Sequence, residues 1–425
     1  MKRMKKTILI ACSILAAAVL TATAQSSTKS PYSQFGLGQL SERSQGISRG
    51  MNGVGIALQQ GNMVNTLNPA SYGGVDSLTM IFDASITGQT TNFKEGATKQ
   101  NATSANFDYI VASFRAWRNV GVSVGVLPLT NIGYSYSTTT AVNQEYGKLT
   151  ETYSGEGGLH EAFLGVGWHA LKPLYIGVNA GYLWGDLSRT VVTSNSNISS
   201  LQKSYSSTVK SYKLDAGIQW RQPLGKQDVL TLGATIGIGH KLGADATLDI
   251  VNVSKNDTTP FRVKNALELP WSWGVGLAWN HGNILTLAAD MEMQQWGKTT
   301  FPTYSNDNYL PTSGLMTDRM KLNAGAEWIP DINAPNHYLK RIRYRFGAGL
   351  STPYYKINGE DGPRDFSVSL GLGLPFQNQY FSRSIVNISG QWVHSSAKNF
   401  ITENTFRINI GITFNERWFA KWKVE

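Results

Sequence analysis

A strict alternation of apolar and polar residues is the feature that most constrains this 425-residue chain. The clearest examples are residues 212–220, 320–328, 341–350 and 406–415. In the first of them, Tyr212, Leu214 and Ile218 are apolar, and Lys213 and Asp215 lie between them. Consecutive side chains of a β-strand point to opposite faces, so each segment has one apolar face and one polar face. The pattern excludes helices at these places and predicts an all-β fold.

About fourteen such segments follow one another along the chain. They begin near Leu78, Asn106, Val120, Leu159, Leu174, Tyr205, Asp228, Pro260, Asn283, Asp318, Arg341, Asp365, Arg383 and Thr402. Their connections alternate between long polar stretches, such as residues 137–158, and short turns, such as residues 118–119. Outer-membrane barrels have an even number of strands, short periplasmic turns and long external loops. We therefore predict a transmembrane antiparallel β-barrel of about fourteen strands with both termini in the periplasm.

The positions of the tryptophans are consistent with a strand in the wall of a membrane barrel. Trp271, Trp273 and Trp279 share one face of residues 269–280. A strand of eight residues is about 26 Å long, and at the usual tilt it covers roughly 20 Å of the membrane normal. The tryptophans are therefore expected to mark both membrane interfaces. The alternative is a soluble β-sandwich with a tryptophan-rich core, which long loops on one side only fit poorly.

The N-terminus has the pattern of a secretory signal peptide. Four basic residues, Lys2, Arg3, Lys5 and Lys6, precede the apolar run 8–20, and the small residues 22–24 form a cleavage site. We assign residues 1–24 to the signal. The alternative is a lipoprotein signal ending at Cys12, but the apolar run continues past that cysteine.

Composition excludes several classes of protein. Even the longest apolar run, residues 8–20, is shorter than the roughly 18 residues that a transmembrane helix needs. Cys12 is the only cysteine, so removal of the signal leaves no thiol for a disulfide, a metal site or a nucleophile. The formal charge of +10 falls to 10 − 4 = +6 without the signal, and the basic residues are not clustered. We therefore expect no nucleic-acid partner.

The mature chain divides into three parts. Residues 25–77 are rich in Gly, Ser, Asn and Gln and lack periodicity. A barrel of fourteen strands has a lumen that something must fill, so we expect this part to be a hatch that plugs the lumen. Residues 78–416 form the barrel. Residues 417–425 form a basic, aromatic periplasmic tail, which either docks a partner or lipid head groups or is a frayed end.

The predicted hatch resembles a known family. The stretches 35–38, 48–57 and 65–71, the last containing Asn68, Pro69 and Ala70, are similar to the hatch of the FadL (OMPP1/FadL/TodX, long-chain fatty acid transport) outer-membrane family. Residues 269–278 look like that family's strand with a proline and a Gly-x-Gly pattern. The resemblance implies a fourteen-strand barrel with an N-terminal hatch that ends in the Asn-Pro-Ala motif.

The resemblance also implies a function. Family members take up hydrophobic small molecules passively, through an external groove, a site inside the barrel and a lateral exit in the wall. The expected partners are outer-membrane lipid and a hydrophobic or amphiphilic small molecule. The external loops here are polar, unlike the apolar loops of the family's capture groove. The alternative is therefore an accessory barrel that does not transport and belongs to an outer-membrane secretion or assembly complex with other outer-membrane or periplasmic proteins.

Four arginines are candidates for ligand binding. Arg341, Arg343 and Arg345 fall on the polar face of one predicted strand, and Arg407 falls on the polar face of the last strand. The polar face of a barrel strand points into the lumen, where guanidinium groups could hold an anionic head group. The alternative is a structural network that braces the hatch or pairs with lumen carboxylates such as Glu327.

Two further sequence patterns give little indication of a catalytic or metal site. Residues 46–50 match Gly-x-Ser-x-Gly, but an esterase needs that motif on a strand-to-helix turn and no strand is expected before it. The six histidines have no metal-ligand spacing. We expect neither an enzyme, nor a cofactor, nor a metal.

Overall fold

A computed structural model describes residues 28–143, 147–195, 198–255, 257–331, 334, 337–376 and 384–417. The predicted signal peptide and most of the predicted tail lie outside these residues. Within them, no helix has the length and apolar character needed to cross a membrane.

Fourteen antiparallel strands form a closed barrel, as the alternation predicts. The wall strands are β2 (Thr79–Glu95), β3 (Thr98–Trp117), β4 (Val120–Asn143), β5 (Gly147–Leu171), β6 (Leu174–Asn195), β7 (Ile198–Leu224), β8 (Asp228–Gly237), β13 (Ser272–His281), β14 (Leu285–Gln294), β17 (Arg319–Trp328), β18 (Arg343–Ser351), β21 (Arg364–Phe376), β22 (Ser384–Ser396) and β23 (Thr402–Arg417). Each pairs with the next, and β2 pairs with β23 from Thr79↔Arg417 to Lys94↔Thr402. This last pairing closes the barrel, so its wall has no free edge at that seam.

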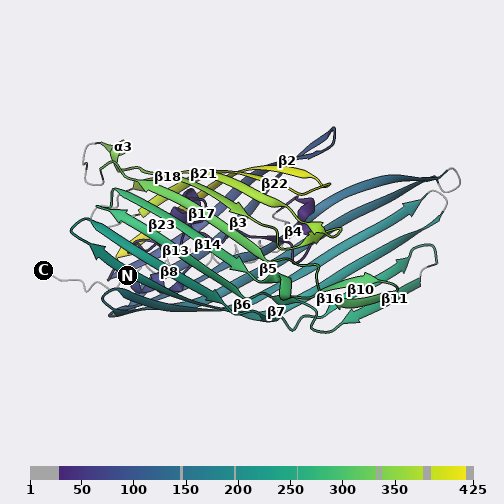
Figure 1. Ribbon diagram of the computed structural model, residues 1–425, viewed down its shortest axis with the longest axis horizontal. Helices are drawn as coiled ribbons and strands as arrows, with labels where there is room; N and C mark the ends of the chain where they lie inside the picture. The colour runs from purple at the N-terminus through teal and green to yellow at the C-terminus, as the bar shows by residue number, and fades with distance from the viewer. Residues whose placement is uncertain are drawn as a thin grey trace, which may run out of the picture.

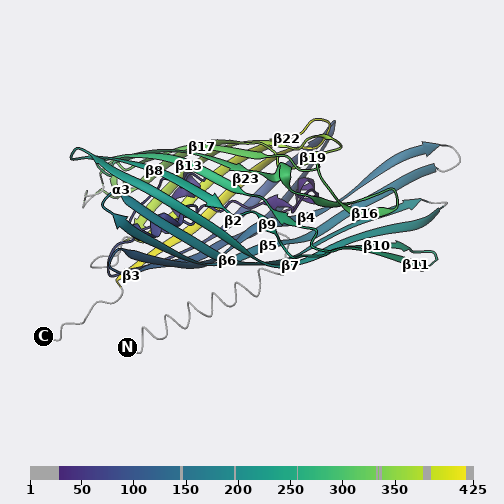
Figure 2. The same cartoon turned by 60° about the horizontal axis from the view of Figure 1, so that its bottom comes forward.

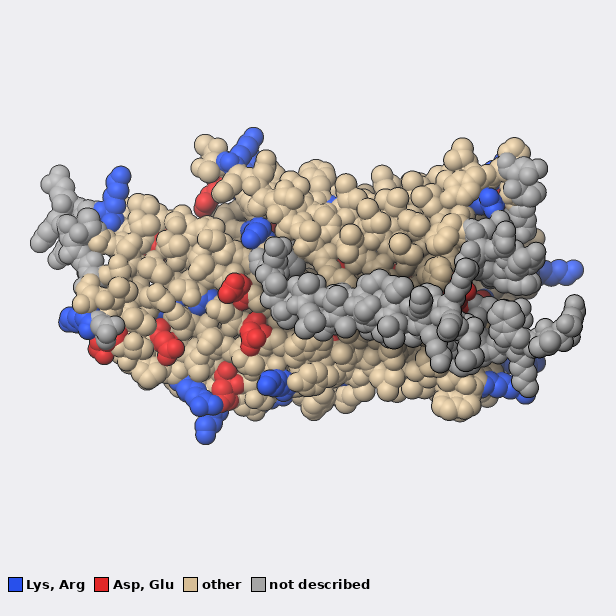
Figure 3. Space-filling model, turned by 180° about the vertical axis from the view of Figure 1, so that it is seen from behind, with Lys and Arg blue, Asp and Glu red and all other residues tan. Residues whose placement is uncertain are grey.

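The outer face of the wall is apolar. Side chains such as Ile86, Leu164, Val178, Leu232 and Phe406 are 49–60% exposed, as a surface that faces lipid requires. Figure 3 shows that the barrel half of the molecule carries few charged side chains between its charged rims. The predicted inward and outward faces are therefore correct.

Four strands extend far beyond the barrel at the end with the long connections (Figure 1). They are β4, β5, β6 and β7, with 24, 25, 22 and 27 residues. At about 3.3 Å per residue, strands of this length reach roughly 80 Å, well beyond a bilayer core of about 30 Å. Residues predicted as loops, such as 137–158 and 188–204, are therefore mostly strand. They are polar on both faces because water surrounds both faces outside the membrane.

An additional hairpin widens this extension. It consists of β10 (Ala246–Asn252), which pairs with β7, and β11 (Asp257–Val263). The strand predicted near Pro260 is therefore wrong as a wall strand, since the wall continues at β13. A second hairpin, β15 (Phe301–Ser305) with β16 (Asn308–Thr312), packs Tyr309 against the buried Leu248 of β10. The two hairpins form a small core outside the barrel.

Several short elements lie at the same end. They are β9 (His240–Lys241), β12 (Glu268–Leu269), η3 (Trp296–Lys298), β19 (Lys356–Ile357) and β20 (Glu360–Asp361). Together with the wall they enclose an apolar cluster that includes Leu37, Leu242, Leu267, Trp296 and Tyr354. At the opposite end, the described connections between wall strands are tight turns and one longer connection that contains α3 (Tyr338–Arg341).

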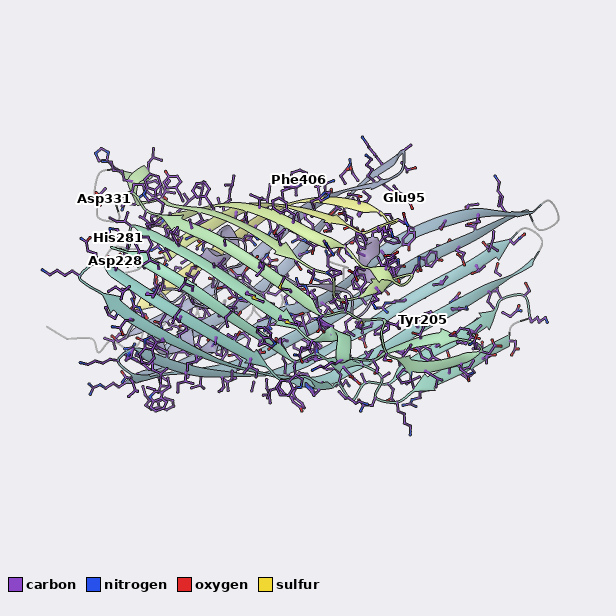
Figure 4. The ribbon with its side chains drawn as sticks, viewed as in Figure 1. Glu95, Tyr205, Asp228, His281, Asp331 and Phe406 are labelled. Carbon is purple, nitrogen blue, oxygen red and sulfur yellow. The ribbon has the colours of Figure 1, made fainter. Side chains whose placement is uncertain are left out.

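The N-terminal segment, residues 28–77, runs through the lumen, as the purple elements inside the barrel in Figure 2 show. It contains η1 (Pro31–Gln34), β1 (Gln39–Leu40), α2 (Gly46–Gly50) and η2 (Pro69–Gly74). Figure 4 identifies the two ends of the barrel, because Asp228 and His281 lie together at the short-turn end, far from Glu95 and Tyr205. The segment begins at the long-connection end, where Ser30 Oγ donates to Glu403 Oε1 at 2.6 Å. The described residues thus start and finish at opposite ends of the barrel. The predicted periplasmic position of the two chain termini concerns residues before 28 and after 417, which lie outside the described residues.

Candidate functional site: the lumen and its N-terminal segment

The Asn-Pro-Ala motif anchors the N-terminal segment to the wall near the short-turn end. Asn68 Oδ1 accepts the amide of Ala70 at 3.1 Å and caps η2. Asn68 Nδ2 donates to the carbonyl of Ile56 at 2.8 Å and to the wall carbonyl of Ile218 at 3.2 Å. A Cβ atom added to Gly177 of β6 would lie 2.3 Å from the carbonyl carbon of Pro69. The motif therefore fixes backbone position and leaves no polar atom of Asn68 for a ligand.

Wall glycines allow the segment to contact the strands backbone to backbone. A Cβ atom on Gly121 would lie 1.9 Å from Tyr72 O, one on Gly233 would lie 2.3 Å from Ile56 O, and one on Gly347 would lie 2.4 Å from Met51 C. Real Cβ atoms do not approach this closely. These glycines lie on different strands, β4, β8 and β18, so the fit extends around the lumen. Their role is close approach of two backbones.

Ion pairs join the segment to the strands. Arg43 Nη2 lies 2.9 Å from Glu161 Oε2, Arg49 Nη2 lies 3.2 Å from Asp108 Oδ1, and Lys321 Nζ lies 2.8 Å from Glu42 Oε2. In addition, Asp290 Oδ2 accepts the amides of Gly55 and Ile56 at 2.5 and 2.8 Å. Every side chain in the three pairs is at most 22% exposed. Removal of one partner from such a pair leaves a buried charge, which is costly.

The four predicted arginines have different surroundings. Arg345 is buried, and its Nε lies 2.8 Å from Glu327 Oε2. Arg343 Nη1 lies 3.1 Å from Glu327 Oε1 and donates to Gln60 of the N-terminal segment at 3.1 Å. These contacts match the structural network named as the alternative. Arg341 was placed wrongly, because it ends α3 outside the lumen, with its guanidinium 5.5 Å from the ring of Tyr338.

Arg407 differs from the other three arginines in its partners. It points into the lumen from β23, and its guanidinium donates only to neutral amides, to Gln89 at 3.1 Å and to Gln391 at 3.3 Å. No carboxylate in the described part of the chain forms a salt bridge with it. Arg407 also borders the central cavity of the lumen. It is therefore the predicted arginine best placed to meet a negatively charged group.

The central cavity has a volume of about 260 Å³ and lies between the N-terminal segment and the wall. Its apolar lining includes Leu37, Leu40, Ile56, Leu67, Leu129 and Trp296. Its charged lining consists of Glu42, Arg43, Lys213, Asp215, Asp290, Glu292, Arg319, Lys321, Asp365, Glu403 and Arg407. Of the sequence-predicted residues, only Arg407 is among them. The other ten charged residues come together only when the chain folds, because they lie on the N-terminal segment and on different wall strands. The sequence alone does not show which of them are neighbours.

The cavity reaches the wall where β8 ends. There β8 and β13 are last paired through Gly237 and Ser272. The lining includes Ile236, Ile238 and Trp273, which are 46%, 39% and 38% exposed on the outer face of the wall. Because Gly237 has no side chain, the wall is thin at this point. The cavity is therefore bordered by residues from both sides of the wall.

The Gly-x-Ser-x-Gly stretch lies on a short helix. Residues 46–50 fold as the short helix α2, and Ser48 is buried against the wall with no histidine bonded to it in the described structure. Among the described residues, no group of three His, Cys, Asp or Glu side chains is arranged to hold a metal ion.

The fold of this chain is FadL-like, as comparison with solved structures shows. The toluene transporter TodX of P. putida superposes with a TM-score of 0.61 at 14% identity, covering 89% of this chain and 100% of TodX. The CymD monoaromatic hydrocarbon channel gives 0.60 at 13% identity, covering 90% and 100%. A Pseudomonas aeruginosa FadL homologue gives 0.59 at 10% identity, covering 89% and 98%. At these identities the likeness establishes the fold alone. No curated protein matches the sequence significantly.

A family model places the chain more narrowly. The model described as BamG matches residues 4–425. The chain therefore belongs to the BamG family, and it has the FadL-like fold.

Proposed function

We propose that this protein is a passive conduit through which a small hydrophobic or amphiphilic molecule crosses the outer membrane. The observation that carries the proposal is the cavity that reaches the outer face of the wall at the end of β8. A molecule in that cavity has a short path to lipid beside Ile238, just beyond the last β8–β13 pair, Gly237↔Ser272. The structural neighbours include toluene transporters and a monoaromatic hydrocarbon channel, which supports a substrate of this kind. No step of this path requires catalysis.

The size and lining of the cavity limit the ligand. A volume of about 260 Å³ lies just below the range of about 300–1,000 Å³ that is usual for small-molecule sites. The cavity suits a single ring or a short chain better than a long acyl chain. Leu40, Leu67 and Leu129 would contact its apolar part, and Arg407 would hold an anionic group if the ligand has one. We propose that export uses the signal peptide 1–24 and that the C-terminus is periplasmic.

Uptake by whole cells tests this function, because hydrophobic molecules already cross a plain phospholipid bilayer. The protein is produced in a Gram-negative host that lacks its own FadL-like barrel, and uptake of radiolabelled toluene and octanoate is measured. Ser272→Trp places a large side chain in the cavity at the wall, and Leu287→Trp places the same side chain on the lipid face. We expect uptake above the empty host, at least a tenfold loss with Ser272→Trp and no loss with Leu287→Trp. Equal uptake in all strains would contradict the proposal.

A second candidate function rests on a different observation. The N-terminal segment is fixed by buried ion pairs and by backbone contacts at wall glycines around the lumen, which suits a sealed barrel. Such a barrel would be an accessory subunit of an outer-membrane secretion or assembly complex. Purification from the native membrane in mild detergent, followed by mass spectrometry of proteins and lipids, separates the two functions. Stoichiometric protein partners without an enriched small amphiphile would favour the subunit, and a lone barrel with such a molecule would favour the conduit.

A further inference from the structure

Four connections at the short-turn end each expose a large apolar side chain within two residues of a lysine or arginine. They join β3 to β4, β5 to β6, β7 to β8 and β17 to β18, and we call them the short-turn rim. Their apolar residues are 49–69% exposed and are Trp117, Leu171, Leu224 and Leu339. Their basic residues are also exposed and are Arg118, Lys172, Lys226 and Lys340. The same combination therefore recurs on separate parts of the rim.

An aromatic band on the outer face of the wall marks the membrane interface at this end. It consists of Trp168, Trp220 and Trp328, which are 46–51% exposed. Trp168 precedes Leu171 by three residues, and Trp220 precedes Leu224 by four on the same face of β7. Tryptophan in membrane proteins gathers at the level of the lipid head groups. The basic residues of the short-turn rim lie just beyond this band, so their long side chains reach the phosphate layer.

The protein supplies no counter-charge to these basic residues. Within the described chain, none of the four forms a salt bridge or a side-chain hydrogen bond. One carboxylate at this end, Asp228, is already engaged, because its Oδ1 lies 2.9 Å from His281 Nδ1 and accepts from Trp279 Nε1 at 3.0 Å. Figure 3 views the molecule from behind and shows Lys and Arg side chains projecting at the right, where the short turns lie. The rim can therefore offer positive charge to a ligand.

The position of the rim identifies the ligand. The wall beside it faces lipid, and the short turns of outer-membrane barrels face the periplasm, where the leaflet consists of phospholipids. An exposed apolar side chain next to an unpaired cation suits a membrane interface, because the apolar group contacts acyl chains while the cation attracts an anionic head group. A phospholipid phosphate can also accept charge-assisted hydrogen bonds from Lys and Arg.

We propose that the short-turn rim binds anionic phospholipids of the periplasmic leaflet. Each basic residue holds a head-group phosphate, and the adjacent Trp or Leu contacts the acyl chains of the same lipid. These contacts hold the barrel at a fixed depth in the membrane. The proposal goes beyond the conduit function and does not depend on it, since no residue of the four pairs borders the central cavity.

Lipid crosslinking at two apolar positions tests the proposal. The full-length protein is reconstituted in vesicles of equimolar phosphatidylglycerol and phosphatidylethanolamine. A photoreactive leucine analogue is placed at Leu171, beside Lys172, or at the exposed Ile284 in the β13–β14 turn, which has no lysine or arginine. One Lys near an anionic surface contributes about fivefold to binding. We therefore expect about fivefold more phosphatidylglycerol than phosphatidylethanolamine at position 171, equal amounts at position 284, and no enrichment at position 171 in Lys172→Gln.

Removal of charge from the whole rim completes the test. The rim variant combines Arg118→Gln, Lys172→Gln, Lys226→Gln and Lys340→Gln. The matched control removes four exposed lysines at the opposite end, through Lys148→Gln, Lys255→Gln, Lys264→Gln and Lys298→Gln. In native mass spectrometry with the same two lipids, we expect wild type and control to retain phosphatidylglycerol at least tenfold over phosphatidylethanolamine and the rim variant to retain both equally.

Three results would overturn the proposal. They are equal retention of the two lipids by wild type, equal retention of phosphatidylglycerol by the rim variant and the control, and capture of a periplasmic protein in place of lipid by the Leu171 probe in native membranes. If the rim variant does not fold, the single variant Lys172→Gln with the probe at position 171 still decides, because persistent enrichment there would contradict the role of the lysine.

Discussion

Replacement of one wall glycine by alanine is expected to detach the N-terminal segment. At Gly347 the added methyl group would lie 2.4 Å from Met51 C and 2.6 Å from Asn52 N. Both neighbours are backbone atoms, so no side-chain rotation relieves the contact. Overpacking of this kind costs about 1–3 kcal/mol. These close contacts exist only while the segment is docked, so the detached population should rise about 5- to 150-fold.

Trypsin cleavage after Arg49 measures this population. Arg49 is largely buried when the segment is docked, and cleavage of a transiently opened segment follows its equilibrium population when closing is fast. The matched control is Gly390→Ala, on wall strand β22, where the added Cβ has no neighbour within 4 Å. We expect the cleavage rate to rise 5- to 150-fold in Gly347→Ala and to stay within twofold of wild type in Gly390→Ala. Equal rates in the two variants would refute the argument from backbone contact.

Two other predictions concern the ion pairs of the segment. Asp108→Asn removes the salt bridge of the largely buried Arg49 guanidinium and leaves it only the more distant charge of Glu42, so docking should weaken by about 3 kcal/mol in the same cleavage assay. Lys398→Ala at an exposed pair should have no measurable effect. Burial opposes ionisation of Glu42, but the charges of Lys321 and Arg49 outweigh it and lower the pKa of Glu42 to about 2. Because the docked pKa is below the ordinary value of 4.5, this carboxylate stabilises docking above pH 4.5, and the contribution is lost as the pH falls through 2. Pepsin cleavage of the segment between pH 4.5 and 1.5 should show this step in wild type and lose it in Glu42→Gln; an unchanged profile would contradict the assignment.

The wall of the barrel could be predicted from the sequence because the membrane imposes the pattern. Residues that face lipid must be apolar, so alternation in segments such as 406–415 reports strand, face and register together. The same rule does not apply outside the membrane. Residues 137–158 are polar on both faces, so they show no alternation and were predicted as a loop, although Ser, Thr and Tyr there form long strands.

The candidate site could be predicted only in part. Alternation continues through Ile342 and Tyr344, so Arg341 was predicted on the strand, although the backbone there is helical. The contact of Arg49 with Asp108 joins residues far apart in the chain, and no local pattern encodes it. One signal was available in the sequence. Glycines such as Gly121, Gly233 and Gly347 recur at inward positions, and a bare inner wall indicates that another backbone lies against it.

Ion conductance in a planar lipid bilayer tests most directly the claim that the N-terminal segment closes the barrel. The wild-type protein, Gly347→Ala and a variant lacking residues 28–76 are reconstituted under identical conditions. We predict no steady conductance for wild type, brief openings for Gly347→Ala and a steady open pore for the deletion. A steady conductance of wild type equal to that of the deletion would contradict the account, because the segment would then leave the lumen open.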